Sequence, residues 1–151
     1  MDYPHQPVMV NEVLKNLITS NEGIYVDGTA GSGGHSEAIG NMISAKGRLI
    51  CLDRDLDAID IAQKRLDRLD AQVDLININY SQIGKALKDF GIDKISGVLL
   101  DLGMSSYQLD LSGRGFSFNR DEPLDMRMDL NTKTNARDLI NNLSLKEIDR
   151  N

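Results

Sequence analysis

Apolar and polar residues follow two alternating rhythms along the first hundred residues. Short apolar runs rich in β-branched residues predict strands, and segments with apolar residues three and four positions apart predict helices between them. The predicted strands are 24–27, 48–52, 73–78 and 97–101. The predicted helices are 8–19, 36–44, 55–69 and 82–90, the last capped by Ser81. This alternation predicts an α/β fold with a parallel sheet and right-handed crossovers.

The rhythm breaks after Asp101. Residues 102–133 contain several glycines and no clear periodicity, which is typical of a functional loop, an entry to another domain or a disordered segment. A short helix is predicted at 136–142, and another begins at Leu145.

The run 97–101 is nearly all apolar, which predicts a strand covered on both faces. Four strands are few for a doubly wound sheet, so we expect the sheet to be incomplete.

Composition narrows the class of protein. The chain has 151 residues, 40% hydrophobic and 26% charged, which is typical of one soluble globular domain with a real core. It has no apolar run long enough to span a membrane and no signal-peptide pattern at its start, so we interpret it as cytoplasmic, without a membrane partner. Cys51 is the only cysteine, which excludes an internal disulfide and a thiolate metal cluster and predicts a buried apolar role. The net charge of −6 argues against tight, stand-alone binding to RNA or DNA.

The segment from Asp27 to His35 is the first candidate for chemistry. It is rich in glycine, joins a predicted strand to a predicted helix, and is followed by Asp53 at the end of the next strand. Such a turn lets the backbone approach a ligand, and a carboxylate about 20 residues later can accept hydrogen bonds from ribose hydroxyls. Ser36 takes the place of the third glycine of a dinucleotide fingerprint. This departure favours S-adenosylmethionine, whose carboxylate and amino groups would meet the backbone near Gly33, Gly34 and His35.

Structural alternatives stay open for these residues. The glycine turn could be a tight strand-to-helix connection without a ligand, and Asp53 could cap the helix that follows it. His35 could support the first turn of its own helix or touch the polar end of the cofactor. No second histidine lies near it in the sequence, so we do not expect it to bind a metal.

Two further strand ends carry candidate residues. Tyr80 follows the third predicted strand, where its ring could stack on adenine or could be an ordinary surface tyrosine. Asp101 ends the fourth predicted strand, where the methyl acceptor would arrive. Its carboxylate could hydrogen-bond the N–H groups of an exocyclic amine and orient the nitrogen lone pair. The alternative is a strand-end cap.

Several motifs resemble, in order, those of one family. They are Asp27-Gly28-Thr29-Ala30-Gly31-Ser32-Gly33-Gly34-His35, Asp53-Arg54-Asp55, Leu99-Leu100-Asp101-Leu102-Gly103-Met104-Ser105-Ser106-Tyr107-Gln108-Leu109-Asp110, Arg114-Gly115-Phe116-Ser117-Phe118, Pro123-Leu124-Asp125-Met126-Arg127-Met128-Asp129, and the opening His5-Gln6-Pro7-Val8. The chain resembles the N-terminal half of the bacterial small-subunit (16S) ribosomal RNA cytosine-N4 methyltransferases, the MraW/RsmH family.

The resemblance implies a Rossmann-like class I methyltransferase sheet and methylation of the N4 amine of a cytidine in the decoding region of 16S rRNA. It implies S-adenosylmethionine contacts at Gly33, Gly34, His35, Asp53, Tyr80, Asp101 and Gln108, with Asp101 as the catalytic residue and no metal. It also implies that residues 1–110 form the cofactor-binding domain and that 111–151 begin an inserted helical domain for substrate recognition. The family's members are longer than this chain.

Two rival hypotheses remain. A nicotinamide-dependent oxidoreductase would share the strand, glycine turn and acid, but the absent third glycine and the motif after Asp101 speak against it. A non-catalytic fragment that keeps the half-sheet without a competent site is the alternative from a different class.

Overall fold

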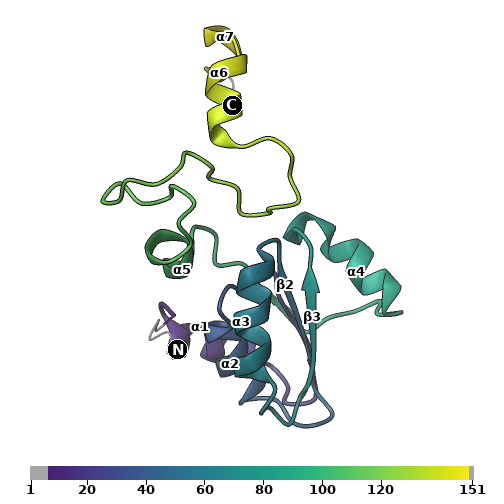
Figure 1. Cartoon of the computed structure of the whole chain (residues 1–151). Helices are drawn as coiled ribbons and strands as arrows, with labels where there is room; N and C mark the ends of the chain where they lie inside the picture. The colour runs from purple at the N-terminus through teal and green to yellow at the C-terminus, as the bar shows by residue number, and fades with distance from the viewer. Residues whose placement is uncertain (1–6, 150–151) are drawn as a thin grey trace. The chain divides into compact units, whose positions relative to one another are not determined.

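The buried apolar runs of the first hundred residues form a four-stranded parallel sheet in the computed structural model, which describes residues 7–149 (Figure 1). The strands are β1 (Ile24–Asp27), β2 (Arg48–Asp53), β3 (Gln72–Asn77) and β4 (Gly97–Leu99). They pair in the order β3-β2-β1-β4, and every pair is parallel. The predicted α/β class with a Rossmann-like parallel sheet is therefore confirmed.

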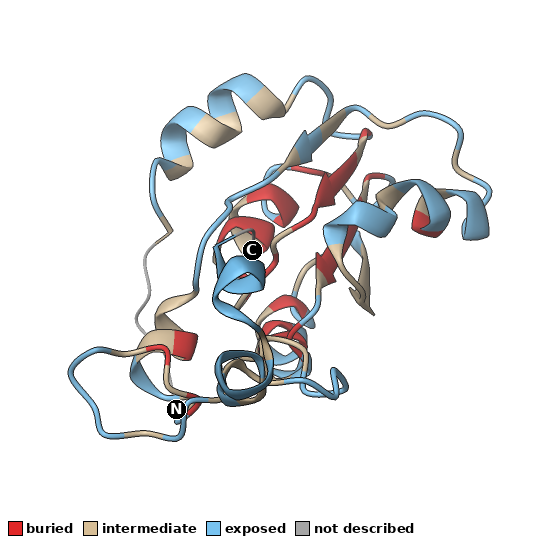
Figure 2. Cartoon of the chain, turned by 90° about the horizontal axis from the view of Figure 1, so that it is seen from above, coloured by how far each residue is buried: buried red, intermediate tan, exposed pale blue. Residues whose placement is uncertain are grey.

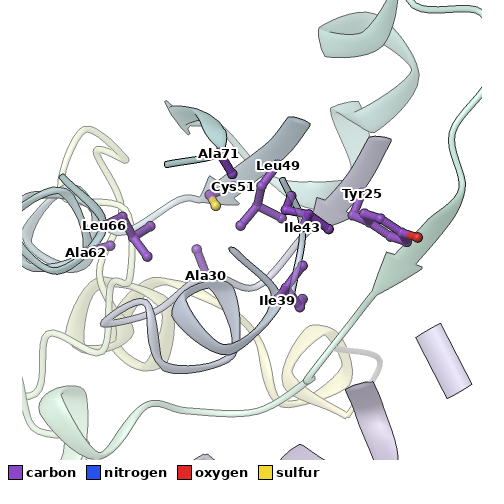
Figure 3. Close-up of a cluster of buried hydrophobic side chains, with 9 residues drawn as sticks. All are labelled: Tyr25, Ala30, Ile39, Ile43, Leu49, Cys51, Ala62, Leu66 and Ala71. Atoms are coloured by element: carbon purple, nitrogen blue, oxygen red, sulfur yellow. The ribbon is translucent and has the colours of Figure 1, made fainter. Parts of the chain in front are cut away.

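Helices cover both faces of this sheet. The first face packs against α1 (Val10–Leu17), α2 (Gly34–Gly40) and α3 (Leu56–Leu66), and the second packs against α4 (Ile83–Asp89). The core of the first face, drawn in Figure 3, consists of Tyr25, Ala30, Ile39, Ile43, Leu49, Cys51, Ala62, Leu66 and Ala71. Figure 2 shows that burial is concentrated in the strands and the inward sides of their helices. Cys51 lies in this core, as predicted, and its burial raises the pKa of the thiol above its usual range.

An ionic contact joins α2 to α3 beside the core. Glu37 accepts a hydrogen bond from Arg65 Nε at 2.7 Å and another from Arg68. Burial alone would raise the pKa of the Glu37 carboxyl, but the two guanidinium groups outweigh it and hold that pKa below its usual value. The ion pair between Glu37 and Arg65 fixes α2 against α3. It thereby also fixes the glycine-rich loop between β1 and α2, which leads into α2.

The chain divides into two compact units, Met1–Gly103 and Met104–Asn151. The second contains α5 (Ser106–Asp110), α6 (Ala136–Asn142) and α7 (Leu145–Ile148). The predicted helix at 136–142 is confirmed, and α7 begins at the predicted residue. Helix α5 was not predicted, although its start carries a capping box in which Ser105 and Gln108 each accept a backbone N–H from the other.

Two predictions about element ends are wrong. Strand β4 stops at Leu99 and is not covered on both faces: Leu99 packs against the core of the first face, but Val98, on the opposite face, is not part of the second core among the described residues. Val98 is 40% exposed and Leu100 is 43% exposed. Ser81 does not cap α4, because it lies inside a short 3-10 helix, η1 (Tyr80–Gln82), whose cap is Asn79. Among residues 7–149, no helix combines the length and apolar character needed to cross a bilayer.

Candidate active site

The glycine loop between β1 and α2 crosses the carboxyl ends of the two neighbouring strands. Gly28 N–H donates to the carbonyl of Leu99 at 2.9 Å, and Ala30 N–H donates to the carbonyl of Leu52 at 3.0 Å. Parallel strands present their ligands at this edge, where backbone groups are left without a ladder partner. The loop is thus fastened to β4 on one side and β2 on the other.

Two glycines of the loop have left-handed backbones. Gly31 has φ of 52°, and Gly33, the N-cap residue of α2, has φ of 83°. A Cβ on Gly33 would lie 3.3 Å from the Cα of Ala62 in α3, whereas a Cβ on Gly31 would meet only the Thr29 carbonyl oxygen, at 3.9 Å. Gly33 therefore serves the packing of α2 on α3, and Gly31 leaves the loop surface open.

We expect Gly33→Ala to destabilise the protein more than Gly31→Ala. The left-handed backbone costs an alanine about 1 kcal/mol at either position. At Gly33 the new methyl group also presses on the backbone of α3, which brings the total to about 2–4 kcal/mol. Urea unfolding of the two variants measures the difference, and equal losses would contradict the packing role of Gly33.

Asp27, the last residue of β1, is fully buried beneath the loop. Its carboxylate accepts hydrogen bonds from Thr29 N–H at 3.1 Å and from Ser36 Oγ at 2.6 Å. The Cys51 thiol in turn donates to Ser36 Oγ at 3.3 Å. Burial raises the pKa of the Asp27 carboxyl in spite of these hydrogen bonds. The sequence pattern marks Asp27 only as the start of the glycine-rich motif, although an acid that ends a buried strand is itself a signal.

The raised pKa of Asp27 predicts a pH dependence of stability. The folded protein holds this proton more tightly than the unfolded chain does. The contribution of Asp27 is therefore most favourable below about pH 4, the ordinary range for aspartate, and is lost as the pH rises through the raised value. Asp27→Asn removes this dependence. Denaturant unfolding of the wild type and of Asp27→Asn, at pH values from about 4 upward, measures this dependence. A difference in unfolding free energy between the two proteins that does not change with pH would contradict the raised pKa of Asp27.

Asp53 ends β2 and faces the same loop. Its Oδ2 accepts Gly31 N–H at 2.8 Å, and its Oδ1 accepts Asp55 N–H at 2.9 Å. The N-cap of α3 is Asp55, which accepts Asp57 N–H, so the alternative of Asp53 as that cap does not hold. Burial raises the pKa of the Asp53 carboxyl. Each carboxylate oxygen has a further lone pair beyond its backbone donor, so Asp53 can brace the loop and still accept hydroxyl groups.

Tyr80 and Asp101 flank the loop from β3 and β4. Tyr80 opens η1, and its Cβ lies 3.2 Å from the position that a Cβ on Gly28 would take, with the residue 41% exposed. Asp101 lies two residues beyond β4, and its N–H donates to Thr29 Oγ1 at 2.7 Å. The Thr29 hydroxyl therefore ties the loop to the chain segment after β4, a role that no local sequence pattern indicates.

His35 is the predicted residue whose surroundings are most unusual. The side chain is buried in the first turn of α2, and its Nε2 lies 3.5 Å from Asp101 Oδ2. Its Nδ1 is buried and has no hydrogen-bond partner among residues 7–149. Buried polar atoms in proteins are nearly always paired, so this nitrogen is suited to a ligand group. Within the same described range, no group of three metal-ligating side chains occurs.

Gln108 belongs to the second unit. It is buried, and its side-chain oxygen and backbone N–H both serve the capping box of α5. All other predicted site residues belong to the first unit. In the second unit, the buried guanidinium of Arg114 donates to the carbonyls of Arg127 and Met128, and Arg127 pairs with Asp125, so these arginines organise their own loop.

The sequence profile of the MraW methylases matches residues 2–150. The chain belongs to the MraW methylase family. Two curated family members are Ribosomal RNA small subunit methyltransferase H of Lachnospira eligens, 45% identical over 99% of this chain and 48% of its own length, and its namesake from Petrotoga mobilis, 46% identical over 94% of this chain and 50% of its own length. The chain therefore spans about half the length of these MraW relatives. The similar opening at His5 and Gln6 lies outside the described residues.

Solved structures also show similarity to this MraW chain. A putative rRNA methylase from Clostridium thermocellum aligns with a TM-score of 0.45 at 24% identity, over 49% of this chain and 40% of the other. NSun6 from Pyrococcus horikoshii with SFG aligns with a TM-score of 0.47 at 24% identity, over 62% of this chain and 23% of the other.

Proposed function

We propose that this chain is the S-adenosylmethionine-binding half of a methyltransferase that modifies the N4 amine of a cytidine in the decoding region of 16S rRNA, in the cytoplasm. One observation supports this most strongly. The carboxylate that ends β2 and the backbone of Asp101 after β4 are both hydrogen-bonded to the same glycine loop. The two acids to which we assign ribose binding and amine orientation are thus tied to one loop at the edge where parallel sheets bind ligands.

The residues of the first unit fit the cofactor. Asp53 would accept the ribose hydroxyls, and the half-exposed ring of Tyr80 offers a face for adenine. The backbone of Gly33 and Gly34 would meet the amino acid end, together with Nδ1 of His35, which has no hydrogen-bond partner within residues 7–149. When bound, S-adenosylmethionine supplies an electrophilic methyl group. Gln108 stays in the proposed set on the strength of the family resemblance.

Asp101 carries the proposed chemistry on the acceptor side. Its side chain is 45% exposed, so a substrate group can reach the carboxylate. The carboxylate would accept an N–H of the cytidine amine, turn the nitrogen lone pair toward the methyl group and offset the positive charge that develops as the N–C bond forms and the methyl–sulfur bond breaks. A neutral thioether would be the leaving group, and the surplus amine proton would pass to the carboxylate or to water. The rest of the rate enhancement comes from holding two reactants in line. The base must leave its stack to reach such a site.

The remaining parts of the proposal concern organisation and partners. We propose small-subunit rRNA as the substrate, bound chiefly by parts of the full-length enzyme other than this chain, because the chain carries a net charge of −6. The predicted division at residue 110, with a recognition domain beginning at 111, is kept as a proposal. It would leave α5 with the cofactor-binding part. Membership of a methylase family leaves the oxidoreductase alternative without support.

The decisive assay is methyl transfer to RNA. The chain would be joined to the C-terminal half of the Lachnospira eligens relative and incubated with small ribosomal subunits and S-adenosylmethionine labelled on the methyl group. Nucleoside analysis should then find N4-methylcytidine. Label on another nucleoside would overturn the assigned acceptor. Absence of label from a hybrid that is folded and binds the cofactor would favour a non-catalytic half-sheet.

A further inference from the structure

The two ring nitrogens of His35, at the end of the glycine loop, have different surroundings. Nε2 lies 3.5 Å from Asp101 Oδ2, and Nδ1 has no partner among the residues that the structure describes. The residue is only 7% exposed, so bulk water does not satisfy the ring. The two nitrogens therefore require different partners.

The surroundings favour one tautomer of the ring. A carboxylate can only accept, so the nitrogen that faces Asp101 is the one that carries hydrogen. Among the described residues, a hydrogen on Nδ1 would find no acceptor, which is unfavourable for a buried donor. The neutral tautomer with hydrogen on Nε2 leaves Nδ1 as a buried acceptor. An ammonium group is the matching donor, and the proposed cofactor carries one at its amino acid end.

We propose that His35 is a positioning residue that couples cofactor binding to the orientation of the Asp101 carboxylate; this inference rests on the proposed function. An ammonium donor at Nδ1 fixes the ring and its tautomer, and Nε2–H then holds Asp101 Oδ2. Thr29 also supports Asp101, since its hydroxyl accepts Asp101 N–H at 2.7 Å. The glycine loop thus orients the Asp101 carboxylate on the acceptor side and also positions the cofactor.

Two substitutions separate the roles of the two nitrogens. The amide of His35→Asn reaches about as far as Nδ1 and can replace the acceptor, but it falls short of Asp101. The amide of His35→Gln reaches about as far as Nε2 and can donate to Asp101, but it leaves the Nδ1 position empty. We expect His35→Gln to raise the dissociation constant for S-adenosylmethionine by about 10-fold or more, the size expected of a lost charged hydrogen bond. His35→Asn should stay near the wild-type value.

The orientation of Asp101 is read from three-bond Hα–Hβ couplings measured by NMR. In wild type and in His35→Gln, Asp101 should show one large and one small coupling, as expected of a single rotamer, and cofactor should sharpen this pattern in wild type. In His35→Asn the two couplings should average. Asp53 is the internal control, because Gly31 and Asp55 hold its carboxylate without any help from His35, so its couplings should not change.

Three results would overturn the inference: unchanged Asp101 couplings in a folded His35→Asn, a wild-type His35 whose ¹⁵N shifts show hydrogen on Nδ1, or Asp101 couplings that ignore saturating cofactor. The wild-type measurements stand even if a variant does not fold. A wild-type chain that fails to bind S-adenosylmethionine would instead contradict the proposed function, which keeps the two failures distinct.

Discussion

Replacing Asp101 with alanine in the hybrid enzyme should lower the rate of methyl transfer to RNA by about 10²–10⁴-fold, the range that a positioned acid–base group contributes. Cofactor affinity should fall only modestly, because the His35 ring loses the carboxylate that favours its Nε2–H tautomer, and the melting temperature should change little. The side chain is 45% exposed, so its removal leaves no cavity, and the backbone N–H that donates to Thr29 is retained. A single-turnover assay at saturating S-adenosylmethionine isolates the chemical step.

Asp93→Ala is the matched control for this variant. Asp93 is also exposed and lies before the amino end of β4, away from the ligand-binding edge. Its loss should leave the rate near wild type. Near-normal turnover by Asp101→Ala, or an equal loss in both variants, would remove Asp101 from the mechanism.

Asp53→Ala should weaken S-adenosylmethionine binding by about 10²-fold or more, because two hydrogen bonds from ribose hydroxyls to a charged acceptor are lost together. The same change frees the N–H groups of Gly31 and Asp55, so we also expect a loss of about 1–3 kcal/mol in unfolding free energy. Calorimetric titration well below the melting temperature separates the two effects. Asp53→Asn keeps one acceptor oxygen and should fall between alanine and wild type.

Asp60→Ala controls for charge in this experiment. Asp60 is an exposed acid on α3, and none of the loop's hydrogen bonds given for residues 7–149 involves it. We expect its loss to leave cofactor affinity unchanged. Affinity that falls equally in Asp60→Ala and Asp53→Ala would mean that net charge, and not the carboxylate at the end of β2, governs binding.

The central part of the fold could be predicted because local and tertiary demands agree there. The run that contains Cys51 is apolar because β2 lies inside the sheet, and Asp53 follows it because the strand ends at the ligand-binding edge. The helix at 136–142 carries its own capping signals in Asn135 and Asp138. In such segments the residue pattern alone determines the element.

The predictions from sequence failed where contacts with distant residues, or short and weak local signals, determine the structure. Strand β4 has the composition of a buried strand, but the exposure of its second face depends on what packs against that face, which residues 97–101 do not encode. Helix α5 is only one turn long, so its capping box had no periodicity to support it.

The links within the candidate site were also beyond the reach of local patterns. Thr29 and Asp101 are joined across 72 positions of sequence, and no pattern in either segment announces the hydrogen bond. The same is true of the approach of His35 to Asp101. Such contacts follow from the sheet order, so they appear only when the strands are placed side by side.

Calorimetric titration of the 151-residue chain with S-adenosylmethionine tests the proposed cofactor site most directly. We expect saturable heat with one site per chain, because the glycine loop, Asp53 and His35 all lie in the first unit. Absence of heat from a chain that unfolds cooperatively would contradict this expectation and would show that the half-sheet does not form the cofactor site.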